Sequence, residues 1–340
     1  MIAVAFGPPT MAAALEGLAA IRAAAECVEL RLDLFEEPFD LPALLEARGE
    51  LPVVVTLRPP HEGGRSPLDA SARLGVLLQA ATLGAEYVDL EWDAATPEAI
   101  ADLHAAGAQV LVSRHDFTAM PAAFATTWWS ELAALGADVV KIVGTAHDVR
   151  DCLPVFDALR RADRPTVAIA MGAAGLLSRI LAVREPTCLL TYAMLGDATA
   201  TAPGQVAIGE LHARYHVERL GPATRAYGLL GPHAEPVRLD EYNTWFTTDG
   251  QDGIAVPVVC DPDSDAAAIV DAFRGLPMAG WHIHGAELQS QVGQALDEIA
   301  TSACRQGSVN AVVARPDGGL VGHWVESPRE QYALWTTGGL

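Results

Sequence analysis

Short apolar runs recur through the first two-thirds of the chain, and longer Ala/Leu-rich segments separate them. The runs begin at Ile2, Val28, Val53, Tyr87, Val110, Val139, Thr166 and Cys188. Between them, helical periodicity is clearest in residues 11–25, 71–83, 97–106 and 128–135. Strands that alternate with helices pair in parallel, because each return to the sheet crosses over through a helix. Eight such units within about 215 residues predict a closed (β/α)8 TIM barrel.

An open doubly wound sheet is the alternative, but no GxGxxG follows the first strand. The pattern breaks at residues 220–225, a predicted linker that contains Gly221 and Pro222. A second α/β series follows, and we place the barrel in residues 1–219 and a smaller domain in residues 226–340. Its predicted strands are 226–230, 255–259, 281–284, 310–314 and 320–324, and its predicted helices are 240–248, 264–273 and 287–303.

Charge narrows the range of partners. The 340 residues contain 22 Lys+Arg and 43 Asp+Glu, a net charge of −21. Such a protein repels phosphate backbones and anionic lipid heads, so we expect neither a nucleic acid nor a membrane partner. An anionic small molecule remains compatible if basic residues gather in one pocket. The five cysteines form no CxxC pair and no apolar run reaches the ~18 residues of a membrane span, so we expect a cytoplasmic protein.

Charged residues at the ends of the predicted strands are the candidate chemistry, since catalytic groups of barrels lie there. Glu29 and Arg31 alternate with apolar residues in the second run, and Arg58 ends the third. His115 closes the fifth run, and Lys141 lies inside the sixth, where an unpaired lysine is costly. Each has a structural alternative, such as an interior salt bridge or a capping role. Their placement at successive strand ends favours one site.

These motifs carry a family resemblance. Residues 1–217 resemble type I 3-dehydroquinate dehydratase, the Schiff-base enzyme of the shikimate pathway. The likeness rests on an ordered set of motifs: Glu29-Leu-Arg31-Leu-Asp33, Thr56-Leu-Arg58, Glu62-Gly-Gly, Asp89-Leu-Glu91, Ser113-Arg-His115-Asp-Phe, Val140-Lys141-Ile142, Met171-Gly172, Ser178-Arg179 and Ala202-Pro-Gly-Gln205.

The resemblance implies a role for each residue. Lys141 would form an imine with 3-dehydroquinate, His115 would act as general base and then acid, and Glu62 would orient His115. Arg179 would clamp the substrate carboxylate. The other implied substrate-binding residues are Glu29, Arg31, Arg58, Met171, Tyr192, Thr201 and Gln205. Tyr192 and Thr201 stand where the family commonly has phenylalanine and serine. The resemblance implies no metal or other cofactor, and a homodimer.

Residues 226–326 resemble the substrate-binding domain of shikimate dehydrogenase, through Tyr227-Gly-Leu-Leu-Gly231 and Asp317-Gly-Gly-Leu-Val-Gly322. The family's substrate-binding serines correspond to Val237 and Leu239, its catalytic lysine to Leu288 and its catalytic aspartate to Glu326. The chain ends at Leu340, short of a dinucleotide-binding fold. We therefore expect no dehydrogenase activity, and an interface or regulatory role for this domain. A metal site formed by His282, His284, His323 and Glu326 is the weakest alternative.

Two other functions stay open at this point. A Schiff-base aldolase also places a lysine on a barrel strand, but it would cleave a C–C bond. A sensor or scaffold could retain an inherited barrel site without catalysis. The complete set of Lys141, His115, Glu62 and Arg179 favours the dehydratase over both.

Overall fold

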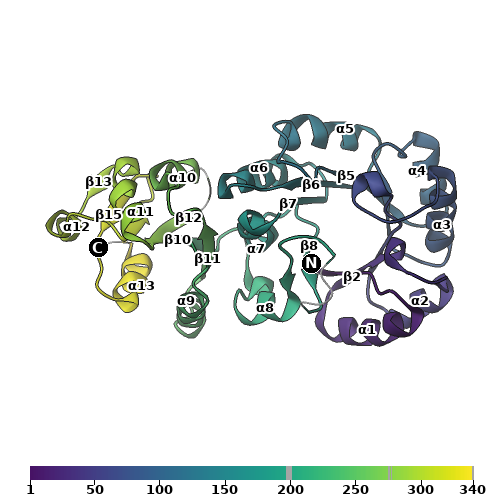
Figure 1. Ribbon diagram of the computed structural model, residues 1–340, viewed down its shortest axis with the longest axis horizontal. Coiled ribbons are helices and arrows are strands. Elements are labelled where there is room, and N and C mark those ends of the chain that lie inside the picture. Colours follow the sequence, from purple (N-terminus) through teal and green to yellow (C-terminus); the bar gives the residue numbers. More distant parts are fainter. Residues whose placement is uncertain (197–200, 275, 277, 339–340) are drawn as a thin grey trace.

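Two separate β-sheets organise the chain, and they lie side by side along its longest axis (Figure 1). The computed structural model describes residues 1–196, 201–274, 276 and 278–338. None of the helices in this part of the chain has the length and apolarity needed to cross a bilayer.

The first sheet curls into a barrel of parallel strands in the order β7-β6-β5-β4-β3-β2-β1-β8-β9. Its strands are β1 (Ile2–Phe6), β2 (Cys27–Arg31), β3 (Val53–Thr56), β4 (Tyr87–Glu91), β5 (Gln109–His115), β6 (Val139–Thr145), β7 (Thr166–Met171), β8 (Thr191–Met194) and the short β9 (Val206–Ala207). The chain before β8 closes the ring: the Thr166 N–H donates to the Thr187 carbonyl at 2.8 Å, and the Leu189 N–H donates to the Thr166 carbonyl at 3.0 Å. The predicted barrel is confirmed, although β8 starts at Thr191 and Cys188 forms only a single parallel bridge.

The inward side chains of the strands divide into an apolar lower part and a polar upper part. Ala3, Val54, Leu111, Val139 and Val167 are fully buried and fill the lower part as one apolar cluster. Because side chains alternate along a strand, the next inward position nearer the carboxyl end carries the charged groups, such as Lys141 two residues after Val139. The core thus supports a polar site above it.

Helices cover the outside of the barrel, and sequence-local caps start several of them. Thr10, Asp40, Asp69 and Thr96 each accept a hydrogen bond from a backbone N–H of the first turn. The helices are α1 (Met11–Ala24), α2 (Leu41–Ala47), α3 (Ala70–Thr82), α4 (Pro97–Ala105), α5 (Trp129–Ala134), α6 (Leu153–Arg161), α7 (Leu176–Leu181) and α8 (Ile208–Ala213). All four predicted helices of the barrel match within a residue or two; the fourth, α5, is preceded by a π-helical turn, Phe124–Trp128.

The second sheet is mixed, in the order β11-β10-β12-β14-β15-β13. Its strands are β10 (Arg225–Gly231), β11 (Gly253–Val259), β12 (Met278–Ile283), β13 (Glu298–Ile299), β14 (Ala311–Ala314) and β15 (Leu320–His323), and its helices are α9 (Pro236–Thr248), α10 (Ala266–Ala272), α11 (Ala286–Gln291), α12 (Thr301–Gln306) and α13 (Pro328–Thr337). Strands β10, β11 and β12 are parallel, whereas β14 pairs antiparallel with both β12 and β15.

The predicted helix over residues 287–303 is wrong. The chain instead forms α11, the edge strand β13 and α12, because the Asp297 N–H donates to the Leu320 carbonyl at 2.9 Å and the Ala300 N–H to the Gly322 carbonyl at 2.8 Å. A Cβ on Gly322 would lie 2.3 Å from the Leu296 side chain, so this glycine lets Leu296 pack directly on β15. Helix α13 is an addition that the sequence pattern did not predict.

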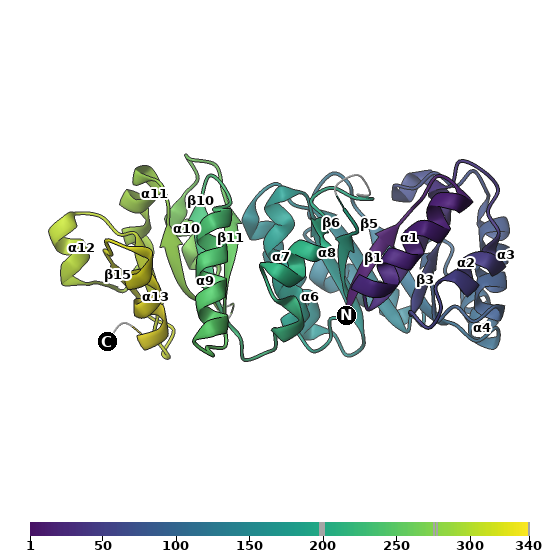
Figure 2. The same ribbon diagram turned by 90° about the horizontal axis from the view of Figure 1, so that it is seen from below.

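The second sheet faces the barrel through β11, which packs against α7 (Figures 1 and 2). Buried residues of both sheets form one continuous apolar cluster that includes Leu177 and Leu181 of α7 and Val256 and Val258 of β11. An ion pair between Arg214, which directly follows α8, and Asp240 of α9 joins the two parts at 2.6 Å. Helix α7 therefore lies between the barrel strands and the second sheet.

Candidate active site

A cavity opens at the carboxyl ends of the barrel strands, with about 520 Å³ of space between protein atoms, its open mouth included. All the sequence-predicted site residues line it: Glu29, Arg31, Arg58, Glu62, His115, Lys141, Met171, Arg179, Tyr192, Thr201 and Gln205. They come from six of the eight barrel strands, β2, β3, β5, β6, β7 and β8, or from the segments that follow them. The barrel thus gathers residues that are up to 176 positions apart (29 to 205).

Lys141 projects from the middle of β6 and is buried among polar partners. Its Nζ donates to Glu29 Oε1 at 3.0 Å, to Asp89 Oδ2 at 2.8 Å and to the Tyr192 hydroxyl at 3.1 Å. It is also the only lysine in the whole sequence. Every other basic side chain is arginine or histidine, and neither can supply the unprotonated primary amine that attacks a carbonyl. The chain therefore has one side-chain amine, and the fold places it inside this cavity.

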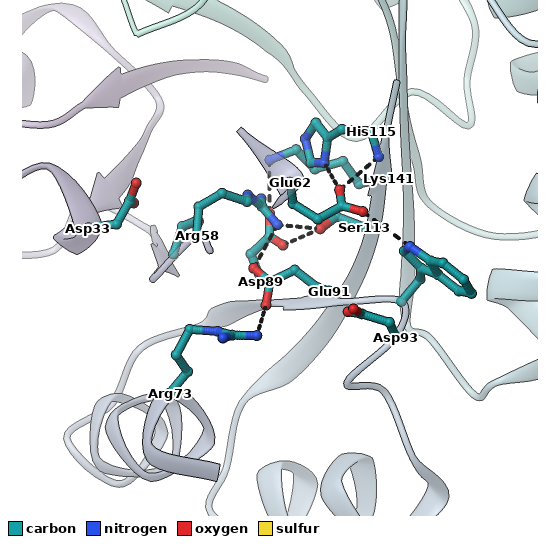
Figure 3. A network of polar contacts seen from close by, with 12 residues as sticks. Asp33, Arg58, Glu62, Arg73, Asp89, Glu91, Asp93, Ser113, His115 and Lys141 are labelled. Atoms are coloured by element: carbon teal, nitrogen blue, oxygen red, sulfur yellow. Dashed lines mark hydrogen bonds and ion pairs between the residues drawn. The ribbon is translucent and has the colours of Figure 1, made fainter. Parts of the chain in front are cut away.

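Asp89 on β4 is the centre of a buried charge network (Figure 3). It is fully buried and accepts from Arg58 Nη2 and from the Ser113 hydroxyl, both at 2.6 Å, besides Lys141. Burial acts to raise the pKa of Asp89, but the adjacent Arg58 and Lys141 outweigh it and lower that pKa. Arg58 also donates to Glu91 at 2.9 Å, so its charge is shared between two carboxylates. Asp89, held by Arg58 and Ser113, thereby fixes the position of one hydrogen-bond acceptor of Lys141.

His115, on β5 next to the strand of Lys141, forms an acid–base pair with Glu62. Glu62 Oε2 lies 2.8 Å from His115 Nδ1 and accepts from the His115 backbone N–H at 2.9 Å. With Glu62 ionised, Nδ1 carries the proton, and Nε2 is the ring nitrogen left to act as a base. Burial, with the positive charges of Arg58 and Lys141, lowers the pKa of His115 well below its usual value. His115 is therefore neutral at pH 7, as a general base must be.

The arginines of the cavity differ in how many of their donors are already used. Arg31 is bound to Asp33 by two hydrogen bonds, at 2.9 and 2.8 Å. Asp33 lies directly after β2, in the 3-10 turn Leu32–Leu34. Arg179, on α7, donates only to the Pro203 carbonyl at 3.1 Å among the described residues, and its buried Nε has no partner there. Burial lowers the pKa of Arg179 to about 10.

The segment after residue 200 closes one side of the cavity. Gln205 accepts from the backbone N–H of Thr201 at 2.8 Å and donates to the Thr201 hydroxyl at 3.2 Å. Gly204 has φ +72, and a Cβ there would lie 2.4 Å from the Gly172 carbonyl oxygen. The turn therefore requires glycine and holds Thr201 and Gln205 against the loop that follows β7.

The sequence-predicted site lacked several residues of this network. Asp89 and Ser113 were seen within motifs but not assigned to the site, although both contact Arg58 and Asp89 also contacts Lys141. Thr56 donates to Glu29 Oε1 at 2.7 Å, and Phe117 stacks on His115 with ring centroids 5.7 Å apart. The signal for Asp89 was available, because a charged residue in an otherwise apolar strand requires a buried partner.

In the second domain, the notable polar groups are two neighbouring histidines and a tyrosine. His282 and His284 lie close together, with ring centroids 4.2 Å apart, and His282 Nδ1 lies 2.9 Å from the Tyr242 hydroxyl. Burial lowers the pKa of His282 to about 3. Across the described ranges, no group of three His, Cys, Asp or Glu is arranged to hold a metal ion. Leu288, at the position of the dehydrogenase family's lysine, is buried in the apolar core.

Comparison with known proteins identifies relatives of both parts. A family model described as type I 3-dehydroquinase matches residues 2–222. The 3-dehydroquinate dehydratase of Desulfotalea psychrophila is 33% identical over 224 residues, which cover 63% of this chain and 97% of that protein. The chloroplastic bifunctional 3-dehydroquinate dehydratase/shikimate dehydrogenase of Arabidopsis thaliana is 30% identical over 306 residues, which cover 88% of this chain. This chain spans half the length of that Arabidopsis relative.

A solved structure shows the same fold over both sheets. The dehydroquinate dehydratase and shikimate dehydrogenase from S. pombe AroM aligns with a TM-score of 0.53 at 23% identity, covering 95% of this chain and 64% of that chain. Together with the Arabidopsis alignment, this confirms the resemblance to a fused dehydratase and dehydrogenase that the sequence motifs indicated.

Proposed function

We propose, from the premise that this chain belongs to the type I 3-dehydroquinase family, that its barrel removes water from 3-dehydroquinate to give 3-dehydroshikimate. One observation carries the proposal: the only lysine of the chain lies in a cavity that also holds a neutral histidine paired with a carboxylate. Imine chemistry requires an amine, and proton transfer next to the imine requires a base that is uncharged at neutral pH.

The proposed reaction consists of imine formation, proton removal from C2, loss of the C1 hydroxyl and hydrolysis of the imine. The Lys141 amine adds to the C3 carbonyl, and loss of one water gives the protonated imine. His115 then takes a proton from C2, and the electron pair moves toward the cationic nitrogen. The C1 hydroxyl leaves as water after it receives that proton from His115, which returns to its neutral form. Hydrolysis of the imine consumes one water, frees the product ketone and restores Lys141.

Charges around the cavity support this course. Glu29 and Asp89, at 3.0 and 2.8 Å from Nζ, are placed to stabilise the positive charge of the protonated imine. Arg31 and Arg58 use donors on carboxylates of the protein, whereas Arg179 has spare donors among the described residues. We therefore assign the substrate carboxylate to Arg179, whose planar guanidinium suits two parallel hydrogen bonds.

The test is direct because the chain has one lysine. 3-Dehydroquinate is added, the enone absorbance of the product is followed, and borohydride then reduces any imine for mass spectrometry. We expect an adduct at Lys141, with neither adduct nor product from Lys141→Ala; the only other amine that could react is the N-terminal one. Turnover without an adduct would contradict the imine mechanism. Neither turnover nor adduct would contradict the activity, and an aldolase or sensor role would replace it.

For residues 226–340 we propose a non-catalytic role, with residues 220–225 as the linker. Val237 and Leu288 replace the residues that the dehydrogenase resemblance requires, and β11 packs against α7, which carries Arg179. By packing on α7, the second domain would hold the Arg179 side chain in its position in the cavity. Met278, which lines a crevice with Leu181 of α7, tests this role. Met278→Asp should raise KM more than it lowers kcat, and Ile299→Asp at the far, exposed edge should change neither.

A homodimer and a cytoplasmic location stay predictions. Light scattering coupled to size-exclusion chromatography measures the first, and cell fractionation the second.

A further inference from the structure

We propose that Trp92 is a positioning residue that fixes the carboxylate of Glu62, and through it the ring of His115; the inference rests on the proposed function above. Trp92 directly follows β4, and its Nε1 donates to Glu62 Oε1 at 3.1 Å. The other oxygen, Oε2, is bound by His115 through both its ring and its backbone N–H. The two oxygens of the Glu62 carboxylate are therefore held from different parts of the barrel: Oε1 by Trp92, which follows β4, and Oε2 by His115 of β5.

Trp92 is itself clamped from outside the cavity. The guanidinium of Arg114 lies 4.4 Å from the centroid of the Trp92 ring and 4.1 Å from that of Trp128, and it is paired with Glu131 at 3.1 Å. Trp128 ends the π-helical turn before α5. Arg114 thus lies within cation–π distance of both indole rings.

The clamp matters because the last torsion of a glutamate side chain is soft. The torsion about the bond to a carboxylate has a broad energy profile, so hydrogen bonds must fix the direction of its oxygens. With Oε1 held by the indole, Oε2 stays aimed at His115 Nδ1. Trp92 does not line the cavity, so it acts through Glu62 and not on the substrate.

Trp92 also favours the ionised form of Glu62. Burial raises the pKa of Glu62 to about 7, with a contribution from Asp93, while Arg58, the His115 backbone N–H and the Trp92 N–H oppose the rise. A hydrogen bond to a charged group changes an ionisation constant by roughly tenfold. Loss of the indole N–H should therefore move the protonation of Glu62 to higher pH.

The experiment replaces Trp92 by Phe in the full chain and titrates glutamate carboxyl carbons by ¹³C NMR. Loss of a signal in Glu62→Gln assigns Glu62. We expect its midpoint to rise by about one pH unit in Trp92→Phe. The acid limb of kcat/KM should rise equally, so that activity falls about fivefold at pH 7 and hardly at pH 9. Trp129→Phe is the matched control: its indole donates at 3.0 Å to Thr166, away from the cavity, and should shift neither curve.

The outcomes separate the two proposals. An unchanged Glu62 midpoint in Trp92→Phe would overturn the role of Trp92, whether or not the enzyme is active. An inactive wild-type protein would overturn the proposed function, and the titration alone would then decide on Trp92. If Trp92→Phe does not fold, Arg114→Met loosens the clamp while it keeps the indole. It should give a smaller shift in the same direction, and no shift would refute the inference.

Discussion

Asp89 binds two buried cations of the barrel, Arg58 and Lys141, so its replacement by Asn is the sharpest test of the charge network. The change keeps the shape of the side chain and removes one negative charge. It also places an amide that donates two hydrogen bonds where a carboxylate accepted three, from Arg58 and Ser113 at 2.6 Å and from Lys141 at 2.8 Å. At least one donor would then face another donor at a fully buried position.

The magnitude follows from the distances. Two unit charges 2.6 Å apart attract by about 6 kcal/mol at an effective dielectric constant of ~20. Part of this attraction offsets the cost of burying the carboxylate, and removal of one partner from a buried pair costs about 3–5 kcal/mol. Asn keeps one accepting oxygen, and Glu29 and Glu91 still face Lys141 and Arg58. We therefore expect Asp89→Asn to destabilise the protein by about 3 kcal/mol.

Urea unfolding followed by circular dichroism measures this loss. With a denaturant dependence of ~3 kcal/mol per molar urea, the midpoint should fall by about 1 M. Asp93→Asn is the matched control: Asp93 pairs with His61 at 2.9 Å on the surface, where both side chains are exposed, and such a pair is worth about 0–1 kcal/mol. Equal midpoints for the two variants would refute the view that Asp89 neutralises buried cations.

Three further predictions concern the cavity. Because the pKa of Glu62 is raised to about 7, its carboxylate is lost as the pH falls through 7; kcat/KM should then fall about tenfold per pH unit below pH 7 as His115 loses its acceptor, and a flat profile down to pH 6 would contradict this. Arg179→Lys should raise KM about ten- to a hundredfold with a smaller change in kcat, since the ammonium cannot form the paired hydrogen bonds. Gly204→Ala forces a Cβ to 2.4 Å from the Gly172 carbonyl at φ +72, so steady-state kinetics should show a several-fold rise in KM.

The barrel could be predicted from the sequence because its elements follow local rules. Apolar runs of strand length alternate with amphipathic segments, and polar caps such as Thr10 and Thr96 mark the helix starts. The second domain was harder, as residues 287–303 show. That segment has helical periodicity, but its middle pairs with β15, more than twenty residues away, and packs Leu296 against Gly322. No local pattern reveals such a distant partner.

The site residues could be located from strand-end positions, and the cavity contains each of them; their roles remain predictions. Which charged side chains of the cavity pair with one another could not be predicted. Nothing in the sequence indicates that Arg31 pairs with Asp33 while Arg179 keeps spare donors, because pairing depends on sub-ångström placement around the ring. Trp92 was missed for a related reason: a tryptophan after a strand is ordinarily a surface or packing residue, and only its hydrogen bond to Glu62 links it to the site.

The charge network gives a reason why Asp89 and Glu29 suit the proposed chemistry. Both carboxylates lie within 3.0 Å of Nζ, which is cationic both as the resting ammonium and as the protonated imine. Their charge is therefore needed at the same point before and during the reaction, and the site requires no rearrangement as the nitrogen changes its bonds. On the proposed mechanism, a single aspartate that also binds Arg58 would serve stability and catalysis together. In the absence of urea, where the Asp89→Asn variant is folded, we expect its kcat to be lower than that of the wild-type protein. A variant that is less stable but fully active would show that the two roles are separate.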